Sequence, residues 1–122
     1  MEQSELKVFL VDDDQIFRFL CKKMLQKFVD KSQIYEFVNG KDALDNIAIN
    51  PDIILLDINM PVLDGWQFLE ELTLVIPNPD IKICIISSSI DPSDKEKFDS
   101  YPFLESFINK PLQIESLEVL FK

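Results

Sequence analysis

The sequence contains no histidine and only two glycines, Gly40 and Gly65. Without histidine, the Ser-His-Asp type of nucleophilic site and imidazole zinc sites are excluded, and any general base must be a carboxylate or a lysine. Two isolated glycines cannot form the glycine-rich loops that bind phosphates in P-loop and dinucleotide-binding proteins. Chemistry in this chain therefore has to rest mainly on carboxylates and lysines.

Cysteines and positive charges are also scarce. Cys21 and Cys84 each lie within an apolar stretch, which is typical of reduced core residues rather than a redox pair. With 12 Lys and Arg against 22 Asp and Glu, the formal net charge is −10. Nucleic acid and anionic membrane surfaces are therefore unfavourable as direct partners, and cations or basic protein surfaces are favoured.

Long apolar runs are missing too, although apolar residues make up 47% of the chain. No run approaches the roughly 20 residues that span a bilayer. The opening Met1-Glu-Gln-Ser-Glu-Leu6 lacks the basic start and apolar stretch of a secretory signal. At 122 residues the chain is long enough for one core and too short for two. We expect a single cytoplasmic domain over residues 1–122, with its core at about 6–121.

Short apolar runs alternate with segments of helical spacing. The expected strands are Leu6–Val11, Ile34–Val38, Ile53–Leu56, Ile81–Ile86 and Phe107–Ile108. Three of these runs contain stretches that are apolar at every position, as in parallel strands covered on both faces. The pattern predicts a doubly wound α/β fold of the flavodoxin-like (βα)₅ type, a three-layer sandwich. Its five parallel strands are expected in the order 2-1-3-4-5.

Helical spacing predicts which side chains cover the sheet. By segment they are Phe17, Leu20, Cys21, Met24 and Phe28; Leu44, Ile47 and Ala48; Trp66, Leu69 and Leu72; and Ile114, Leu117 and Phe121. Asp14 is expected to cap the first helix. The helix expected to begin at Asp91-Pro-Ser-Asp94 has only Phe98 and Tyr101 as apolar anchors, which predicts a short or mobile helix.

Polar side chains follow the predicted strands at the point where each strand ends. They are Asp12 and Asp13, Asp57, Ser87 to Ser89, and Lys110. In a parallel sheet all of them lie at the carboxyl edge, where doubly wound sheets bind ligands. Adjacent strands about 4.8 Å apart would bring Asp13 to about 5 Å from Asp57.

Carboxylates at about 5 Å repel one another by about 3 kcal/mol per pair. A hard cation would offset that repulsion, and an oxygen-only ligand set favours Mg²⁺. With Lys110 added, the arrangement is the one expected for phosphoryl transfer to a carboxylate.

Four sequence blocks at this edge resemble the signature blocks of response-regulator receiver domains. They are Val11-Asp-Asp-Asp14, Leu55-Leu-Asp-Ile-Asn-Met-Pro61 with Asp64-Gly65, Ile85-Ile-Ser-Ser-Ser89 and Phe107-Ile-Asn-Lys-Pro111. The resemblance runs from about Leu6 to the C-terminus. It implies a stand-alone receiver domain without an output domain. Such a domain is not an enzyme toward other substrates and catalyses only its own phosphorylation and dephosphorylation.

The resemblance also implies a role for each site residue. Asp57 would be the phosphoacceptor, receiving a phosphoryl group from a phosphohistidine on a sensor histidine kinase or a histidine phosphotransfer protein. Asp13, Asp57 and the backbone carbonyl of Asn59 would bind Mg²⁺ directly, and Asp12 would act through water. Lys110 would pair with a phosphoryl oxygen, and the Lys110–Pro111 bond would be cis.

Ser87 and Phe107 would form the switch. The hydroxyl of Ser87 would turn toward the phosphoryl group, and Phe107 would report the change sterically because it lacks a tyrosine hydroxyl. The signal would reach a downstream protein through the helix after Asp91, the Phe107–Ile108 strand and the last helix. Asn59 and Ser89 are expected to leave water access and give the phosphoryl group a moderate lifetime. The family's usual glycine and alanine are replaced within Ser100–Glu105, so the resemblance does not define that loop.

Three other classes share parts of this pattern. A pseudo-receiver would keep the fold as a protein-binding module and never take phosphate, yet the acceptor, metal and lysine positions are intact here. A phosphatase of the haloacid-dehalogenase type resembles Asp-x-Asp, whereas Asn59 stands at the second position and there is no room for a substrate cap. A flavodoxin-like electron carrier is excluded because acids, not Gly, Ser or Thr, follow the first strand.

Overall fold

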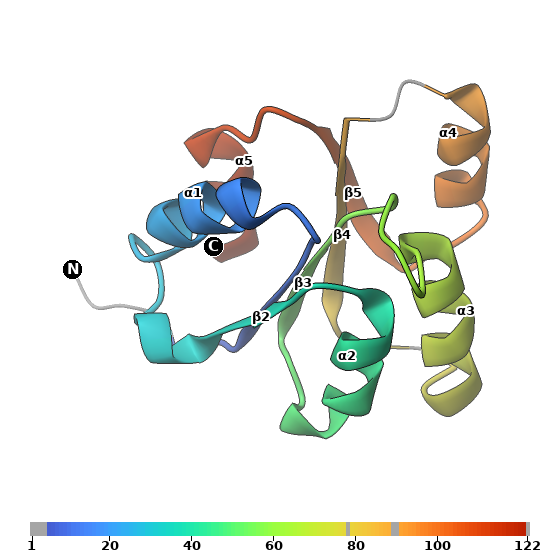
Figure 1. Ribbon diagram of the computed structural model, residues 1–122, viewed down its shortest axis with the longest axis horizontal. Coiled ribbons are helices and arrows are strands. Elements are labelled where there is room, and N and C mark those ends of the chain that lie inside the picture. The colour runs from blue at the N-terminus through green and yellow to red at the C-terminus, as the bar shows by residue number, and fades with distance from the viewer. Residues whose placement is uncertain (1–4, 78, 89–90, 122) are drawn as a thin grey trace.

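The computed structural model describes residues 5–77, 79–88 and 91–121, and its strands form one parallel sheet. The strands are β1 Val8–Val11, β2 Ile34–Phe37, β3 Ile53–Leu56, β4 Lys82–Ser87 and β5 Leu104–Asn109. Their order is β2-β1-β3-β4-β5, and every pairing is parallel. The fold class and strand order predicted from the sequence are confirmed (Figure 1).

Helices cover both faces of the sheet. The α-helices are α1 Gln15–Leu25, α2 Gly40–Asp45, α3 Gly65–Val75, α4 Pro92–Asp99 and α5 Ile114–Glu118, with 3-10 helices at Lys31–Gln33, Ile47–Ile49 and Val119–Phe121. Figure 1 shows α1 and α5 on one face and α2, α3 and α4 on the other. Among the described residues, no helix has both the length and the apolar character needed to cross a membrane.

The core has two parts, one on each face of the sheet. Because side chains alternate along a strand, Val8 and Leu10 pack with α1 and α5, whereas Phe9 and Val11 pack with α2 and α3. Every residue of β1 and β3 is buried, which explains why these strands are apolar at every position. Both cysteines are buried reduced thiols, as predicted.

Side-chain caps start the helices at the carboxyl edge of the sheet. The carboxylate of Asp14 accepts hydrogen bonds from the backbone N–H groups of Ile16 and Phe17, which confirms it as the cap of α1. Asp64 forms a capping box with Gln67 at the start of α3. Both helices therefore begin beside the ends of β1 and β3.

Two residues expected in the helical core are exposed. Leu20 is 53% exposed because the inward face of α1 is centred on Cys21 and Leu25, which are buried one turn apart. Ala48 is exposed because α2 ends at Asp45 and a tighter 3-10 helix follows, which changes the angular spacing of the side chains.

The last strand is longer than its apolar run indicates. β5 begins at Leu104 rather than Phe107 because exposed Glu105 interrupts the apolar pattern of this edge strand without ending its pairing with β4. Before it, the backbone N–H of Leu104 donates to the carbonyl of Tyr101, which closes the turn after α4. This hydrogen bond lies within Ser100–Glu105, the loop whose geometry the sequence did not predict.

Helix α4 is held by contacts rather than by a buried face. None of its residues is buried. Phe98 meets Phe107 of β5 edge-on at a centroid distance of 5.8 Å, and Nζ of Lys95 lies 4.4 Å from the centroid of the same Phe107 ring. After the helix, Tyr101 stacks on Trp66 of α3 at 6.2 Å. The two predicted anchors, Phe98 and Tyr101, are both half-buried.

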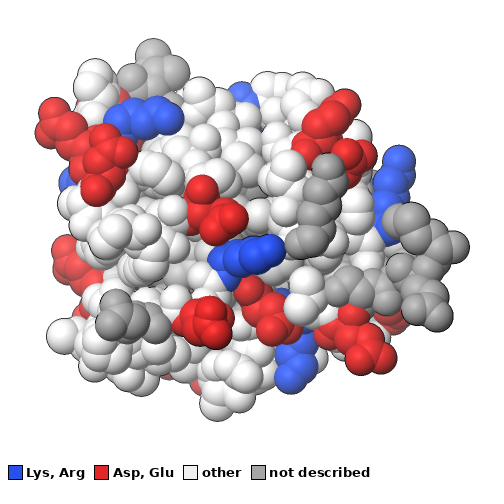
Figure 2. Space-filling model, turned by 180° about the vertical axis from the view of Figure 1, so that it is seen from behind, with Lys and Arg blue, Asp and Glu red and all other residues white. Residues whose placement is uncertain are grey.

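Charged side chains are dispersed on the face seen in Figure 2. Lys and Arg side chains lie among Asp and Glu there rather than forming one continuous basic area. This distribution agrees with the net charge of −10 and gives that face little attraction for a polyanion.

Candidate functional site

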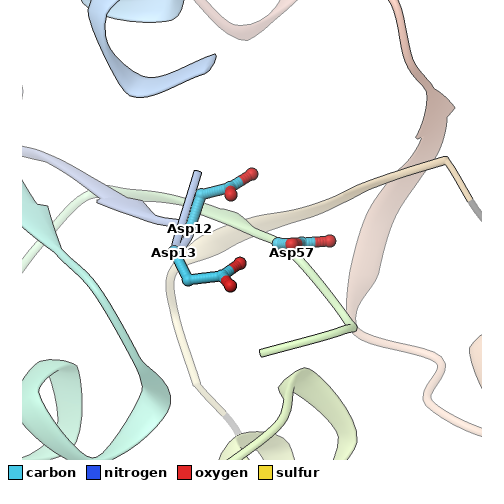
Figure 3. Close-up of side chains that lie close together, drawn as sticks. All are labelled: Asp12, Asp13 and Asp57. Carbon is cyan, nitrogen blue, oxygen red and sulfur yellow. The ribbon is translucent and has the colours of Figure 1, made fainter. Parts of the chain in front are cut away.

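The ends of β1 and β3 are aligned, so the acids that follow them meet. Val11 pairs with Leu56 in the register of the two strands. The backbone N–H of Asp57 donates to the carbonyl of Val11 at 2.9 Å, and that of Asp12 donates to Phe37 at 3.0 Å. Figure 3 shows the carboxyl groups of Asp12, Asp13 and Asp57 pointing to the same side from these two strand ends.

The three acids form one oxygen cluster. One carboxylate oxygen from each of Asp12, Asp13 and Asp57 lies within 4.8 Å of the others. Asp12 is 1% exposed and Asp57 7% exposed, whereas Asp13 is open to solvent. Two buried carboxylates and one exposed carboxylate therefore face a common point that a solute can reach.

Lys110, the residue directly after β5, brings a positive charge to this cluster. Its Nζ lies 2.9 Å from Oδ2 of Asp12 and 4.2 Å from the centroid of the Phe17 ring. The backbone N–H of Lys110 donates to the carbonyl of Ser87, which aligns the ends of β5 and β4. The backbone N–H of Asp14 donates to Oδ1 of Asp12 at 2.8 Å, so both oxygens of this buried carboxylate are bound.

Asp57 is the acid whose charge is costly in this setting. Burial, followed by the negative charge of Asp12, raises the pKa of Asp57 to about 6. The ammonium of Lys110 and the backbone N–H groups of Asn59 and Ile58 act in the opposite direction and lower that pKa. Asp57 is thus held in a place where a bound cation would relieve electrostatic repulsion.

Gly65 allows α3 to pack directly against the acid-bearing strand end. Its backbone N–H donates to the carbonyl of Ile58 at 2.8 Å. A Cβ at this position would come within 2.6 Å of the carbonyl oxygen of Asp57 and 2.8 Å of the Cα of Ile58. The Asp64-Gly65 pair therefore combines a helix cap with a close backbone approach.

The remaining predicted site residues lie around the cluster. Ser87 is fully buried at the end of β4, and Asn59 is exposed in the segment that follows Asp57. Phe107 is half-buried on β5, in contact with α4. The Lys110–Pro111 peptide bond is cis, as the resemblance implies. Ser89 lies outside the described residues.

Two contacts from α1 were not predicted as part of the site. The ring of Phe17 lies against the ammonium of Lys110, and Nη1 of Arg18 donates to the backbone oxygen of Asp12 at 2.7 Å. Side chains in a helix lean toward its N-terminus. Long side chains in the first turn after a capping acid can therefore reach the end of the preceding strand. This position in the sequence is the signal that could have indicated Phe17 and Arg18.

The donor set fits a divalent cation that prefers oxygen. The three clustered ligand atoms are carboxylate oxygens, which hard cations such as Mg²⁺ favour, and the cluster retains solvent access through Asp13. Burial, and after it the negative charge of Asp12, raises the pKa of Asp57, so a cation at the same point would favour its ionised form. This acidic pocket has the composition and spacing needed to bind Mg²⁺.

The fold and this pocket define a class of signalling module, and comparison with known proteins identifies it. The chain belongs to the response regulator receiver domain family, which it matches over residues 8–122. It is 37% identical over 86 residues to a protein-glutamate methylesterase/protein-glutamine glutaminase of Carboxydothermus hydrogenoformans. It is also 29% identical over 94 residues to the transcriptional regulatory protein DegU of Brevibacillus brevis.

These alignments cover 70% and 76% of the chain but only 25% and 39% of the two relatives. Solved structures match over nearly the full length. A two-component response regulator from Cytophaga hutchinsonii has a TM-score of 0.84 and 27% identity, covering 97% of this chain and 96% of that one. The chemotaxis protein CheY4 of Vibrio cholerae has a TM-score of 0.79 and 23% identity, covering 95% of each chain, and supports the fold.

Proposed function

We propose that this chain is a phosphoacceptor response regulator of a cytoplasmic two-component phosphorelay, with Asp57 as the acceptor. The observation that carries the proposal is the meeting of Asp57 with Asp12, Asp13 and Lys110 at one sheet edge. Membership of the receiver family supports it. A sensor histidine kinase or a histidine phosphotransfer protein would donate the phosphoryl group, and a downstream protein would read the result.

The transfer is a displacement at phosphorus. A carboxylate oxygen of Asp57 forms a bond to the phosphorus of the partner's phosphohistidine, the P–N bond breaks, and the imidazole nitrogen leaves with that electron pair. Burial and the charge of Asp12 raise the pKa of Asp57 to about 6, so its carboxylate is more basic than that of a free aspartate, which suits a nucleophile.

The other site residues hold the phosphoryl group. Asp13, Asp57 and the carbonyl of Asn59 would hold Mg²⁺, with Asp12 acting through water. The bound cation would offset the negative charge that gathers on the transferring oxygens. Lys110 would pair with a phosphoryl oxygen, which requires its ammonium to share or leave its contact with Asp12.

The switch would run from the pocket to α4. The Ser87 hydroxyl would turn to the phosphoryl group, and Phe107, two residues before the strand end at Asn109, would change its packing against Phe98 and Lys95. The surface of α4, β5 and α5 would thereby change for a protein partner. The exposed amide of Asn59 would leave the acyl phosphate open to water and give it a moderate lifetime.

Incubation with Mg²⁺ and acetyl phosphate, followed by intact-mass measurement, tests the proposal. We expect a gain of one phosphoryl group that is absent in Asp57→Asn and in the presence of a chelator. Asp52→Asn, which changes an exposed acid at the opposite end of β3, should behave like wild type. The absence of any gain in wild type would favour a protein-binding module that is not phosphorylated.

A further inference from the structure

Arg18 reaches from α1 to the backbone of the acidic pocket. Its Nη1 donates a 2.7 Å hydrogen bond to the carbonyl oxygen of Asp12, and its side chain is only 14% exposed. Its Nε is buried and lies 3.4 Å from Oε1 of Glu36 on β2, an ion-pair contact rather than a hydrogen bond. One guanidinium thus joins a β2 carboxylate to the peptide between Asp12 and Asp13.

This contact fixes the peptide that carries Asp13. A peptide group is planar, so the carbonyl oxygen of Asp12 and the nitrogen of Asp13 belong to one rigid unit. The preceding peptide is held as well, because the N–H of Asp12 donates to the carbonyl of Phe37. The peptide groups before and after Asp12 are therefore both fixed by hydrogen bonds to residues outside the pocket. The bond from Arg18 is the one that fixes the peptide shared with Asp13.

The placement of Asp13 depends on the Arg18 hydrogen bond more than the placement of Asp12 does. The carboxylate of Asp12 is bound by Lys110 and by the N–H of Asp14. Asp13 is exposed, so few packing contacts fix its side chain, and the position of its Cβ relative to Asp57 is set by its backbone.

Lys22 shows that the Arg18 contact is more than an ion pair between α1 and β2. Its Nζ lies 3.1 Å from Oε2 of the same Glu36, one helical turn further along α1. Both cations pair with Glu36 on β2, and Arg18 in addition donates a hydrogen bond to the carbonyl of Asp12. A guanidinium can serve both partners because its donors point in several fixed directions.

We propose that Arg18 is a positioning residue, anchored by Glu36, that holds the Asp12–Asp13 peptide in the conformation that binds the divalent cation. This inference rests on the proposed function. It assigns no direct contact between Arg18 and the cation or the phosphoryl group, and it predicts that affinity for the metal changes rather than the chemical step.

The test compares Arg18→Met, which keeps an apolar stem, with Lys22→Met, which removes the other cation on Glu36. Mg²⁺ affinity is measured by calorimetry, and phosphorylation by acetyl phosphate is followed over a range of Mg²⁺ concentrations. We expect Arg18→Met to weaken Mg²⁺ binding about 10-fold, as for other residues that orient metal ligands. The phosphorylation rate at saturating Mg²⁺ should stay within about twofold of wild type, and Lys22→Met should bind Mg²⁺ like wild type.

A second measurement uses the metal-free protein. In amide NMR, Arg18→Met should lower the backbone order parameter of Asp13, and Lys22→Met should leave it unchanged. If Arg18→Met does not fold, Glu36→Gln, which retains Arg18 but loses its anchor, should shift both measurements in the same direction by less.

Three outcomes would overturn the inference. They are wild-type affinity and Asp13 order in a folded Arg18→Met, equal losses in Arg18→Met and Lys22→Met, and no change in Glu36→Gln if that variant is needed. If wild type itself neither binds Mg²⁺ nor takes a phosphoryl group, the proposed function fails. The Asp13 order parameter then still decides the role of Arg18.

Discussion

The indole N–H of Trp66 donates a 3.0 Å hydrogen bond to Oδ1 of Asp94, which ties the start of α3 to α4. Trp66 directly follows Gly65, whose backbone N–H is bonded to the residue after Asp57. These two bonds connect the backbone beside the acidic pocket to α4, a helix that has no buried residue of its own. The position of α4 is therefore tied to the backbone that carries Asp57.

Asp94→Ala should loosen α4 without dismantling the core. The lost bond joins a nearly buried indole to a carboxylate, so we expect the free energy of unfolding to fall by about 1–3 kcal/mol. Amide hydrogen exchange should quicken across Pro92–Asp99 by more than in α3. Glu96→Ala, which removes an equal charge from an exposed position of the same helix, is the control. Equal exchange rates in the two variants would show that the Trp66 bond does not hold α4.

Asp57→Asn should stabilise the metal-free protein at neutral pH. Because the pKa of Asp57 is raised from 3.8 to about 6, the folded state binds this proton more tightly than the unfolded chain does. The contribution of Asp57 to stability is thus full below about pH 4 and is lost as the pH rises through about 6.

Urea unfolding in a chelator at several pH values measures the effect. The advantage of Asp57→Asn over wild type should grow by up to about 3 kcal/mol between about pH 4 and about pH 7. Asp99→Asn, at an exposed position of α4, should show no such trend. A stability difference between Asp57→Asn and wild type that does not change with pH would show that it does not come from the ionisation of Asp57.

Lys110→Met should leave a buried carboxylate without its cation. Asp12 is 1% exposed, and removing one partner of such a pair typically costs about 3–5 kcal/mol. We expect a loss near the lower end, because the N–H of Asp14 still binds Asp12. Lys41→Met breaks an ion pair of 2.8 Å with Asp45 in which both side chains are more than half exposed, and it should cost much less stability because solvent screens the pair. Chemical denaturation of the two variants gives the comparison, and similar losses would argue against a special role for the Asp12 pair.

Gly65→Ala should damage the site as well as the fold. The added methyl group meets backbone atoms of Asp57 and Ile58, which cannot rotate away, so about 1–3 kcal/mol of stability should be lost together with Mg²⁺ affinity. In Gly40→Ala the new methyl group would meet the backbone oxygen of Leu63 at 2.8 Å. That variant should lose stability but keep most of its affinity in calorimetry. Unchanged Mg²⁺ binding in Gly65→Ala would mean that the close approach does not position Asp57.

Much of the fold and of the pocket could be predicted because they depend on strand ends. Ile53–Leu56 is apolar throughout and buried throughout, and parallel pairing then brings the residues after each strand to one edge. The same rule predicts that Asp12, Asp13, Asp57 and Lys110 lie together, as they do in the structure. The roles assigned to these residues remain predictions for the experiments above.

Contacts between side chains of different elements could not be predicted in the same way. The bonds from Arg18 to Asp12 and from Trp66 to Asp94 depend on side-chain conformations and on how helices sit on the sheet, neither of which has a periodic signal. The exposure of Leu20 has a similar cause. The apolar pattern of a helix indicates which side faces the sheet only to within about one residue. The early start of β5 was missed because an edge strand tolerates polar residues.

Trp66 is also the only tryptophan in the chain. The hydrogen bond that ties α3 to α4 therefore involves the protein's only indole chromophore, which Tyr101 flanks on one face. A displacement of α4 that breaks the bond to Asp94 would change the surroundings of that indole, and its fluorescence emission should change accordingly. Conformational exchange at this surface can thus be followed optically in the unlabelled protein, at concentrations too low for NMR.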